Sequence, residues 1–146
     1  LIFNFFNYLY LGDSGAYLVG FMASILLVDI HFQNSHISPY FIALLLWYPA
    51  FENFFSIFRK IFGKFNPVLP DTYHLHQLIF RFFKQREFIY KKYSNQISAI
   101  VILGYNLFIF LLSLKFINQT IFLIFLIMIN IVVYITTYFL LKKKLS

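Results

Sequence analysis

Four long apolar runs, at about 16–32, 39–58, 97–114 and 121–141, leave this chain few ways to fold outside a membrane. A helix needs about 20 apolar residues to cross the hydrocarbon layer of a bilayer. The first run is short by this measure unless the residues next to it extend it. The runs predict an all-α fold, a polytopic membrane helix bundle with four transmembrane helices.

The composition agrees with a lipid bilayer as the surroundings of these runs. Hydrophobic residues make up 61% of the chain and charged residues 12%, against roughly a quarter charged in a soluble domain. A single soluble core of this size has no room for so many apolar side chains. The chain has no cysteine, which excludes disulfide, thiol and zinc-finger chemistry.

The basic residues are sorted along the chain. Eleven of the 12 Lys and Arg lie in the segment 59–96 or in the C-terminal tail, and Lys115 is the exception. Basic segments stay on the cytoplasmic side of a membrane, so both termini and the loop 59–96 are expected in the cytosol. The formal charge of +7 does not form a stripe on a soluble face, so we expect no nucleic-acid partner.

The chain begins at Leu1, with neither an initiator Met nor a basic region ahead of an apolar run. This is not the pattern of a signal peptide. We expect residues 1–146 to be the C-terminal part of one longer membrane domain.

Gly12-Asp13-Ser14-Gly15 opens the first run. Asp13 or Ser14 can cap the helix by accepting hydrogen bonds from its free N–H groups. Alternatively, Asp13 is a metal ligand or a catalytic carboxylate at the cytosolic face. A stripe of small residues spaced by four follows: Gly12, Ala16, Gly20 and Ser24. The stripe predicts a neighbouring helix packed closely beside Asp13.

Glu52 lies inside the second run, with Pro49 just before it. A carboxylate within a membrane span is costly and points to a function. However, Glu52, Ser56 and Arg59 share one side of a helix, so a structural role is an equal alternative. In that role Glu52 satisfies a polar group of a neighbouring helix or lies shallow enough to be hydrated. Pro49 predicts a kink, because it leaves a carbonyl without its helical partner.

The segment 66–78, Asn-Pro-Val-Leu-Pro-Asp-Thr-Tyr-His-Leu-His-Gln-Leu, approaches a helix through two prolines. Asp71 is placed to cap a helix over about 72–84. The apolar positions of this helix are Leu75, Leu78, Ile79, Phe82 and Phe83, and its polar and basic positions are His74, Gln77, Arg81 and Lys84. This pattern predicts a cytosolic amphipathic interfacial helix.

The start of this helix suits phosphate, because free N–H groups and His side chains there donate hydrogen bonds to anions. Two residues apart on a helix, His74 and His76 diverge by about 200 degrees, so one metal ion held by both is not expected unless the helix starts later. The alternative is an interfacial helix with incidental histidines.

Three motifs together resemble one family. They are Leu11-Gly12-Asp13-Ser14-Gly15, Pro49-x-x-Glu52 followed by Arg59-Lys60, and Pro67-x-x-Pro70-Asp71-x-x-His74-Leu75-His76-Gln77-Leu78. In this order and orientation they resemble the polyprenyl-phosphate N-acetylhexosamine-1-phosphate transferases, which include undecaprenyl-phosphate GlcNAc-1-phosphate transferases and are related to the enzyme that makes lipid I. The resemblance extends from residue 9 to about residue 84.

The resemblance implies an enzyme of the bacterial inner membrane. In the family's reaction polyprenyl phosphate attacks the β-phosphorus of a UDP-sugar such as UDP-GlcNAc, giving polyprenyl-diphosphate-sugar and UMP, and this step starts a cell-envelope polysaccharide such as that of lipopolysaccharide. Mg²⁺ is the implied cofactor, with Mn²⁺ as an alternative. Asp13 matches the family's metal-binding catalytic Asp. His74 and His76 match its His motif near the nucleotide diphosphate, with Asp71 beside them in the substrate-binding group.

The sequence also departs from the family pattern. Gln77 stands where many members have His, and Glu52 where Asp is common. The family's Asp-Asp pair and its Asn- and Asp-rich motif belong to earlier helices and are not in this sequence. The implied partners therefore include missing N-terminal helices of the same protein, and this chain alone is expected to be inactive. A transporter subunit and a non-catalytic membrane bundle are the alternatives, although a transporter should show paired broken helices.

Overall fold

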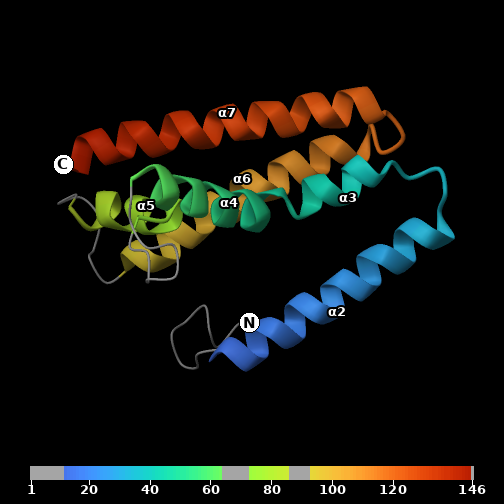
Figure 1. Cartoon of the computed structure of the whole chain (residues 1–146), viewed down its shortest axis with the longest axis horizontal. Coiled ribbons are helices and arrows are strands. Elements are labelled where there is room, and N and C mark those ends of the chain that lie inside the picture. The colour runs from blue at the N-terminus through green and yellow to red at the C-terminus, as the bar shows by residue number, and fades with distance from the viewer. Residues whose placement is uncertain (1–11, 64–72, 86–92, 146) are drawn as a thin grey trace.

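The computed structural model describes residues 12–63, 73–85 and 93–145, and this part of the chain contains helices and no strand. The helices are α2 (Gly12–Gln33), α3 (Pro39–Leu45), α4 (Trp47–Phe62), α5 (Leu75–Lys84), α6 (Ser94–Leu114) and α7 (Thr120–Leu145) (Figure 1). The predicted all-α class is confirmed for the described residues. Residues 1–11 and Asp71 lie outside them.

Three of these helices are long and apolar enough to cross a membrane: Ser14–Gln33 within α2, α6, and α7. They indicate a membrane protein. The predicted span over 39–58 is not one straight helix, because α3 and α4 form a pair bent by 69°. The number of spans is therefore three, or four if the bent pair is one span, and the exact count of four stays a prediction.

The break between α3 and α4 lies at Leu46, one helical turn before Pro49. Pro49 has no N–H to donate to the carbonyl of Leu45, four residues earlier. The ladder resumes when Ala50 N donates to Leu46 O at 3.2 Å. A proline is tolerated in the first turn of a helix, where its missing donor is not needed. The kink expected from Pro49 is therefore present, and it separates two helices. It is the one bent pair found among the described helices.

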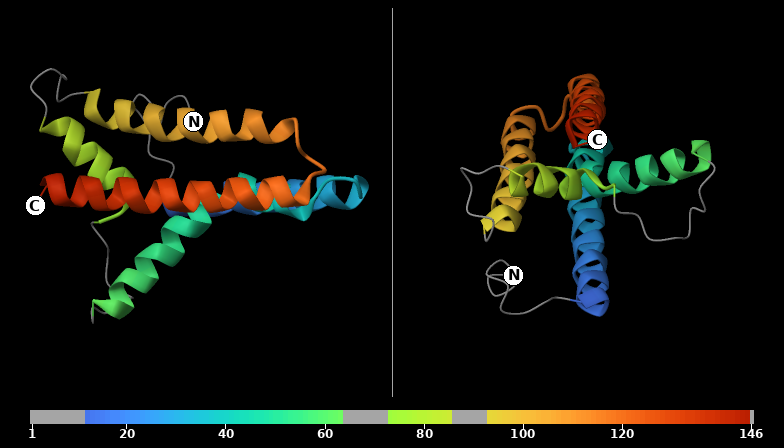
Figure 2. Two further views of the ribbon diagram at one scale, coloured as in Figure 1. Left: turned by 90° about the horizontal axis from the view of Figure 1, so that it is seen from above. Right: turned by 90° about the vertical axis from the view of Figure 1, so that its left-hand side faces the viewer.

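The helices α6 and α7 lie side by side (Figure 2). Two hydrogen-bonding contacts join the segment around their connection to the start of α3. Ser38 N donates to Ile117 O at 3.1 Å, and the Ser38 and Thr120 hydroxyls are 2.9 Å apart. Ser38 is also the N-cap of α3, where its hydroxyl accepts from Tyr40 N and Pro39 follows as the first helical residue. The contacts of Ser38 with Ile117 and Thr120 hold the start of α3 next to the start of α7 at one end of the molecule.

Aromatic side chains join α4 to α7. The rings of Phe51 and Tyr134 meet edge to face with centroids 5.0 Å apart, and those of Phe55 and Tyr138 do so at 4.8 Å. Edge-to-face pairs contribute about 0.5–1.5 kcal/mol beyond burial alone. Tyr138 is almost fully buried. This packing positions the face of α4 that carries Glu52.

The helix α2 projects away from the rest of the bundle (Figure 1). None of the residues in its most apolar window is buried, and its large side chains are exposed, for example Phe21 at 65% and Phe32 at 89%. A Cβ added at Gly12 or Gly20 would meet nothing within 4 Å. The close neighbour predicted from the small-residue stripe is therefore absent among the described residues.

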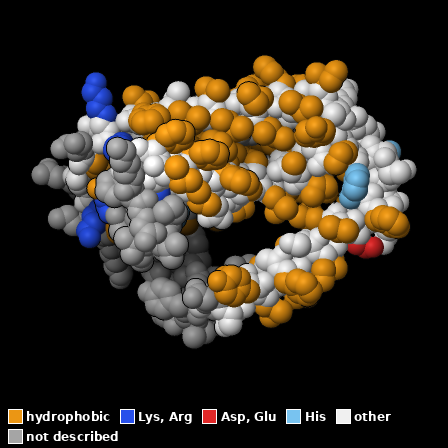
Figure 3. Space-filling view, in the orientation of Figure 1, with side chains coloured by type: hydrophobic (Ala, Val, Ile, Leu, Met, Phe, Trp, Pro, Cys, Tyr) orange, Lys and Arg blue, Asp and Glu red, His pale blue; other side chains and the backbone are white. Residues whose placement is uncertain are grey.

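Charge is sorted along the long axis of the molecule. Figure 3 shows Lys and Arg gathered at the end where α7 terminates, whereas the face between the two ends is covered by hydrophobic side chains. Such a distribution suits helices that cross a bilayer, with their basic ends at one surface. The cytosolic orientation itself stays a prediction.

Candidate functional site

The site is organised around Glu52, an acid buried within α4 and only 6% exposed. Its Oε1 atom accepts a hydrogen bond from the backbone N–H of Leu75 at 2.8 Å and lies 3.0 Å from Nδ1 of His74. The hydroxyls of Tyr48 and Tyr134 are near the same carboxylate. Glu52 and Ser56 are both buried, as expected for one side of the helix. The donors at Oε1 stabilise the buried carboxylate, whereas Glu52 Oε2 and the Tyr48 hydroxyl have no hydrogen-bond partner among the described residues.

Glu52 decides where α5 begins. The helix starts at Leu75 and not near residue 72. Its N-cap is His74, in an extended conformation with φ −67° and ψ 149°. His74 makes no side-chain cap hydrogen bond, so the acceptor for Leu75 N comes from another helix. The predicted cap, Asp71, is three residues before the observed N-cap and lies outside the described residues.

This cap changes the expected phosphate contact. An anion is favoured at a helix N-terminus, where free N–H groups and the helix dipole attract negative charge. At α5 this place is taken by the Glu52 carboxylate. An anion bound at this end would therefore be held by side chains and not by the N–H of Leu75.

His74 and His76 lie with their rings stacked, at a centroid distance of 5.5 Å and an interplanar angle of 16°. The divergence of about 200 degrees expected for two helical residues does not apply here, because the helix starts later, at Leu75. His74 precedes the helix and has extended backbone geometry. The bond to Glu52 engages Nδ1 of His74, which leaves Nε2 as the ring nitrogen for a ligand.

The surroundings of His76 favour its neutral form. Desolvation by burial lowers the pKa of His76 below its ordinary value. The negative charge of Glu52 opposes this shift, and the nearby His74 adds to it. A neutral imidazole near pH 7 can both donate and accept a hydrogen bond.

Arg59 fixes the segment that leads into α5. Its Nη1 atom donates to the carbonyl of Tyr73 and to the hydroxyl of Tyr138, both at 2.7 Å. Its guanidinium group also lies over the rings of Tyr73 and Tyr138, at 5.9 and 5.3 Å from their centroids. Arg59 and Glu52 thus hold two successive points of the chain, Tyr73 and Leu75, on either side of His74.

A cavity of about 520 Å³ opens beside His76, between α5 and α6. Its lining residues are His76, Gln77 and Phe80 from α5, and Asn95, Ser98, Ala99 and Ile102 from α6. Gln77 Oε1 is buried and has no hydrogen-bond partner among the described residues. The volume is within the range of small-ligand sites.

The predicted site residues are only partly brought together. Asp13 lies at the N-terminal end of α2, and its side chain is outside the description. The described His, Asp and Glu residues form no group of three or more that could hold a metal ion. Mg²⁺ prefers oxygen ligands in octahedral geometry, and the pair of histidines does not provide them. The described residues thus do not fit Mg²⁺ by themselves.

Glu52 is the residue whose importance the sequence left undecided. Its signal was an acid inside an apolar run with Ser56 and Arg59 on the same side. Of the two alternatives, the structure supports satisfaction of a polar group on a neighbouring helix. That group is the N-terminus of the helix that carries His76.

Comparison with known proteins finds a similarity to the undecaprenyl-phosphate alpha-N-acetylglucosaminyl 1-phosphate transferase of Yersinia pestis, with 30% identity over 73 residues. The aligned stretch is 49% of this chain and 20% of that enzyme, so the chain matches about a fifth of its relative. No family model matches the sequence. No solved structure matches it either.

Proposed function

We propose that this chain is the C-terminal part of a membrane enzyme that transfers a sugar-1-phosphate, GlcNAc-1-phosphate above all, from a UDP-sugar to polyprenyl phosphate. The enzyme would act in the inner membrane of a bacterium, with both chain ends and residues 59–96 in the cytosol. The observation that supports the proposal most is the stacked pair of histidines held by Glu52 next to an open cavity. The similarity to a transferase of this type supports it independently.

The proposed chemistry is a phosphoryl transfer. An oxygen of polyprenyl phosphate forms a bond to the β-phosphorus of the UDP-sugar, and the bond from that phosphorus to the bridging oxygen breaks, releasing UMP. Catalysis of such a step depends on positioning and on stabilisation of the negative charge. In this chain His74 and His76 would donate hydrogen bonds to the diphosphate, and Asp71 would belong to the same substrate-binding group.

Glu52 acts in this proposal as a positioning residue. Its contact with Nδ1 orients the ring of His74. A carboxylate bound to one ring nitrogen commonly orients a functional histidine in this way. Its contact with Leu75 N fixes the turn that brings His76 beside His74. Both histidines therefore depend on one buried acid in a different helix.

Asp13 is proposed as a metal-binding catalytic residue at the cytosolic end of α2. The metal would be Mg²⁺ or Mn²⁺, and its other ligands would come from outside the described residues. The proposed partners are polyprenyl phosphate, the UDP-sugar, the lipid bilayer and N-terminal helices of the same protein.

The test is transfer of radiolabelled sugar phosphate from UDP-GlcNAc to polyprenyl phosphate in membranes that contain the full-length protein. Asp13→Asn should lower the rate by orders of magnitude, because a metal contact is worth several kcal/mol of charge stabilisation. Its matched control is Asp29→Asn, at the exposed C-terminal part of the same helix. If the two variants were equally active, Asp13 would be a helix cap and no more.

The histidines are tested in the same assay. His74→Ala and His76→Ala should weaken the use of UDP-GlcNAc, seen as a higher KM, a lower kcat or both, with normal expression and membrane insertion. His36→Ala is the control, because His36 is exposed between α2 and α3. Normal activity in both histidine variants would leave α5 as an interfacial helix with incidental histidines. A wild-type protein that transfers no sugar phosphate would instead favour a non-catalytic membrane bundle or a transporter subunit.

A further inference from the structure

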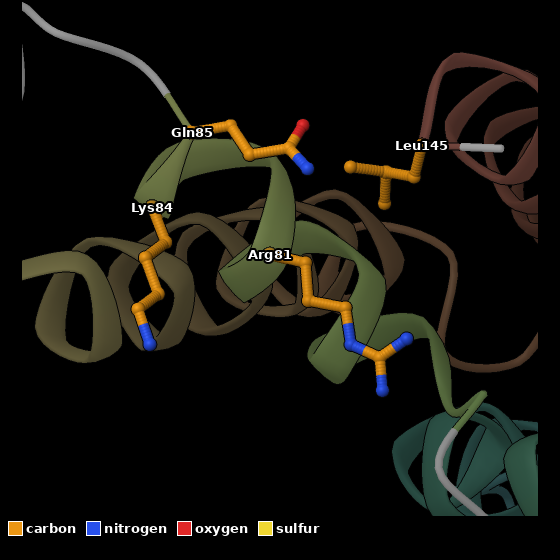
Figure 4. Close-up of a pocket in the computed structure, with 4 residues that line it drawn as sticks. All are labelled: Arg81, Lys84, Gln85 and Leu145. Carbon is orange, nitrogen blue, oxygen red and sulfur yellow. The ribbon is translucent and has the colours of Figure 1, made fainter.

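A second depression lies at the basic end of the molecule, away from the histidines. Its volume is about 440 Å³, and among the described residues it is lined by Arg81, Lys84 and Gln85 of α5 and by Leu145 of α7. Figure 4 shows the side chains of Gln85 and Leu145 facing one another, with Arg81 and Lys84 on the same stretch of α5. The depression therefore combines cations, an amide and an apolar side chain from two helices.

Both α5 and α7 contribute positively charged side chains to this depression. Lys144 of α7 lies over the ring of Phe82 at 5.1 Å, which brings a third cation against α5. Arg81, Lys84 and Lys144 are exposed. Among the described residues no carboxylate forms an ion pair with any of the three. The described part of the pocket thus has an excess of positive charge.

The position of the pocket at the basic end of α7 indicates which kind of anion it can bind. The apolar part of α7 ends at Leu141, directly before Lys142, Lys143 and Lys144, so this end of the helix lies where hydrocarbon gives way to headgroups. Directly before Leu141 in α7, Phe139 and Leu140 are 56% and 69% exposed and form an apolar surface along the helix. A ligand here would place a charged head against cations and a hydrocarbon tail along the helix.

We propose that the Arg81–Lys84–Leu145 pocket binds the phosphate headgroup of an anionic phospholipid of the bilayer, with an acyl chain along the end of α7. Basic pockets between membrane helices are recognised sites for anionic lipid headgroups. Arg81 can hold phosphate through two N–H donors, and Lys84 adds a point charge. The proposal is independent of the transfer reaction, because it uses none of the residues assigned to it.

The experiment measures lipid retention by the purified chain in detergent, using native mass spectrometry. Phosphatidylglycerol and phosphatidylcholine with identical acyl chains are added at equal concentration. The pocket variant is Arg81→Gln with Lys84→Gln, and the matched control is Lys142→Gln with Lys143→Gln. Both variants remove two positive charges at the same end of the molecule, and all four side chains are exposed, so neither should impair folding. Size-exclusion elution checks this.

The wild-type chain should retain phosphatidylglycerol in preference to phosphatidylcholine. Near an anionic surface each cation contributes roughly a fivefold factor, so the pocket variant should lose about tenfold or more of this preference, while the control loses much less. Equal losses in the two variants would mean a diffuse attraction to the membrane surface and would overturn the pocket. A third arm adds polyprenyl phosphate. Displacement of phosphatidylglycerol at equimolar amounts would assign the pocket to the acceptor substrate and overturn the phospholipid proposal.

Discussion

The carboxylate of Glu52 in α4 caps the helix α5 by accepting the N–H of Leu75 at 2.8 Å. Capping residues usually stand next to the helix they cap. Here the acceptor is 23 positions earlier in the chain, and the same oxygen binds His74. One buried acid therefore links the stability of a short helix to the geometry of the two histidines.

Loss of this acid should open the start of α5. Glu52→Ala removes the acceptor for Leu75 N, which should destabilise the contact by about 1–3 kcal/mol. Hydrogen exchange at the amide of Leu75 should become faster, while exchange in α7 changes little. Glu52→Gln keeps an oxygen acceptor, so its exchange rate at the Leu75 amide should lie between those of wild type and Glu52→Ala. Asn53→Ala, an exposed neighbour on α4, is the control, and equal exchange in it and in Glu52→Ala would argue against the cap.

Arg59 and Tyr138 should be coupled energetically. Their hydrogen bond is 2.7 Å long, and the guanidinium group also lies over the tyrosine ring. A double-mutant cycle with Arg59→Gln and Tyr138→Phe should give a coupling of about 1 kcal/mol in the free energy of unfolding in detergent. The bond from Arg59 to Tyr73 O is untouched by Tyr138→Phe. Additive effects would show that the contact contributes nothing to stability.

His76 should make the protein less stable in mild acid. Its pKa is lowered in the folded state, chiefly by desolvation, so the unfolded chain binds the proton more readily. The stability due to neutral His76 is therefore complete above the ordinary pKa of about 6.5, and it is lost as the pH falls through the lower pKa of the folded state. Thermal unfolding between pH 8 and pH 5 should show a larger loss for wild type than for His76→Gln. The groups facing it, Glu52 and His74, are present in both, so parallel curves would contradict the prediction.

The orientation can be tested with single cysteines, because the chain has none of its own. Ser35 and Gln85 are exposed on opposite sides of the predicted membrane, whereas Ser94 is fully buried and would not react from either side. In intact cells an impermeant thiol reagent should label Ser35→Cys and not Gln85→Cys. Lysis should make Gln85→Cys reactive. The reverse pattern would mean that the basic segments face outward, against the positive-inside rule.

The apolar runs were sufficient to predict the helices α2, α6 and α7, because length and hydropathy alone decide which segments suit a bilayer. Their boundaries agree with prediction to within a few residues, where helices end by local polarity. The break near Pro49 was also readable, since a missing N–H is a property of one residue. What the sequence missed was its consequence, two helices bent by 69°.

The arrangement around Glu52 was decided by tertiary structure alone. Asp71 was the local choice for a cap, but the N-cap is His74, and its helix is capped by an acid from α4. The same change of starting point allows His74 and His76 to stack, where helical geometry at both residues would separate them. Periodicity and capping rules use neighbours along the chain. A hydrogen bond between residues 23 positions apart depends on how α4 and α5 pack, and that packing became visible only in three dimensions.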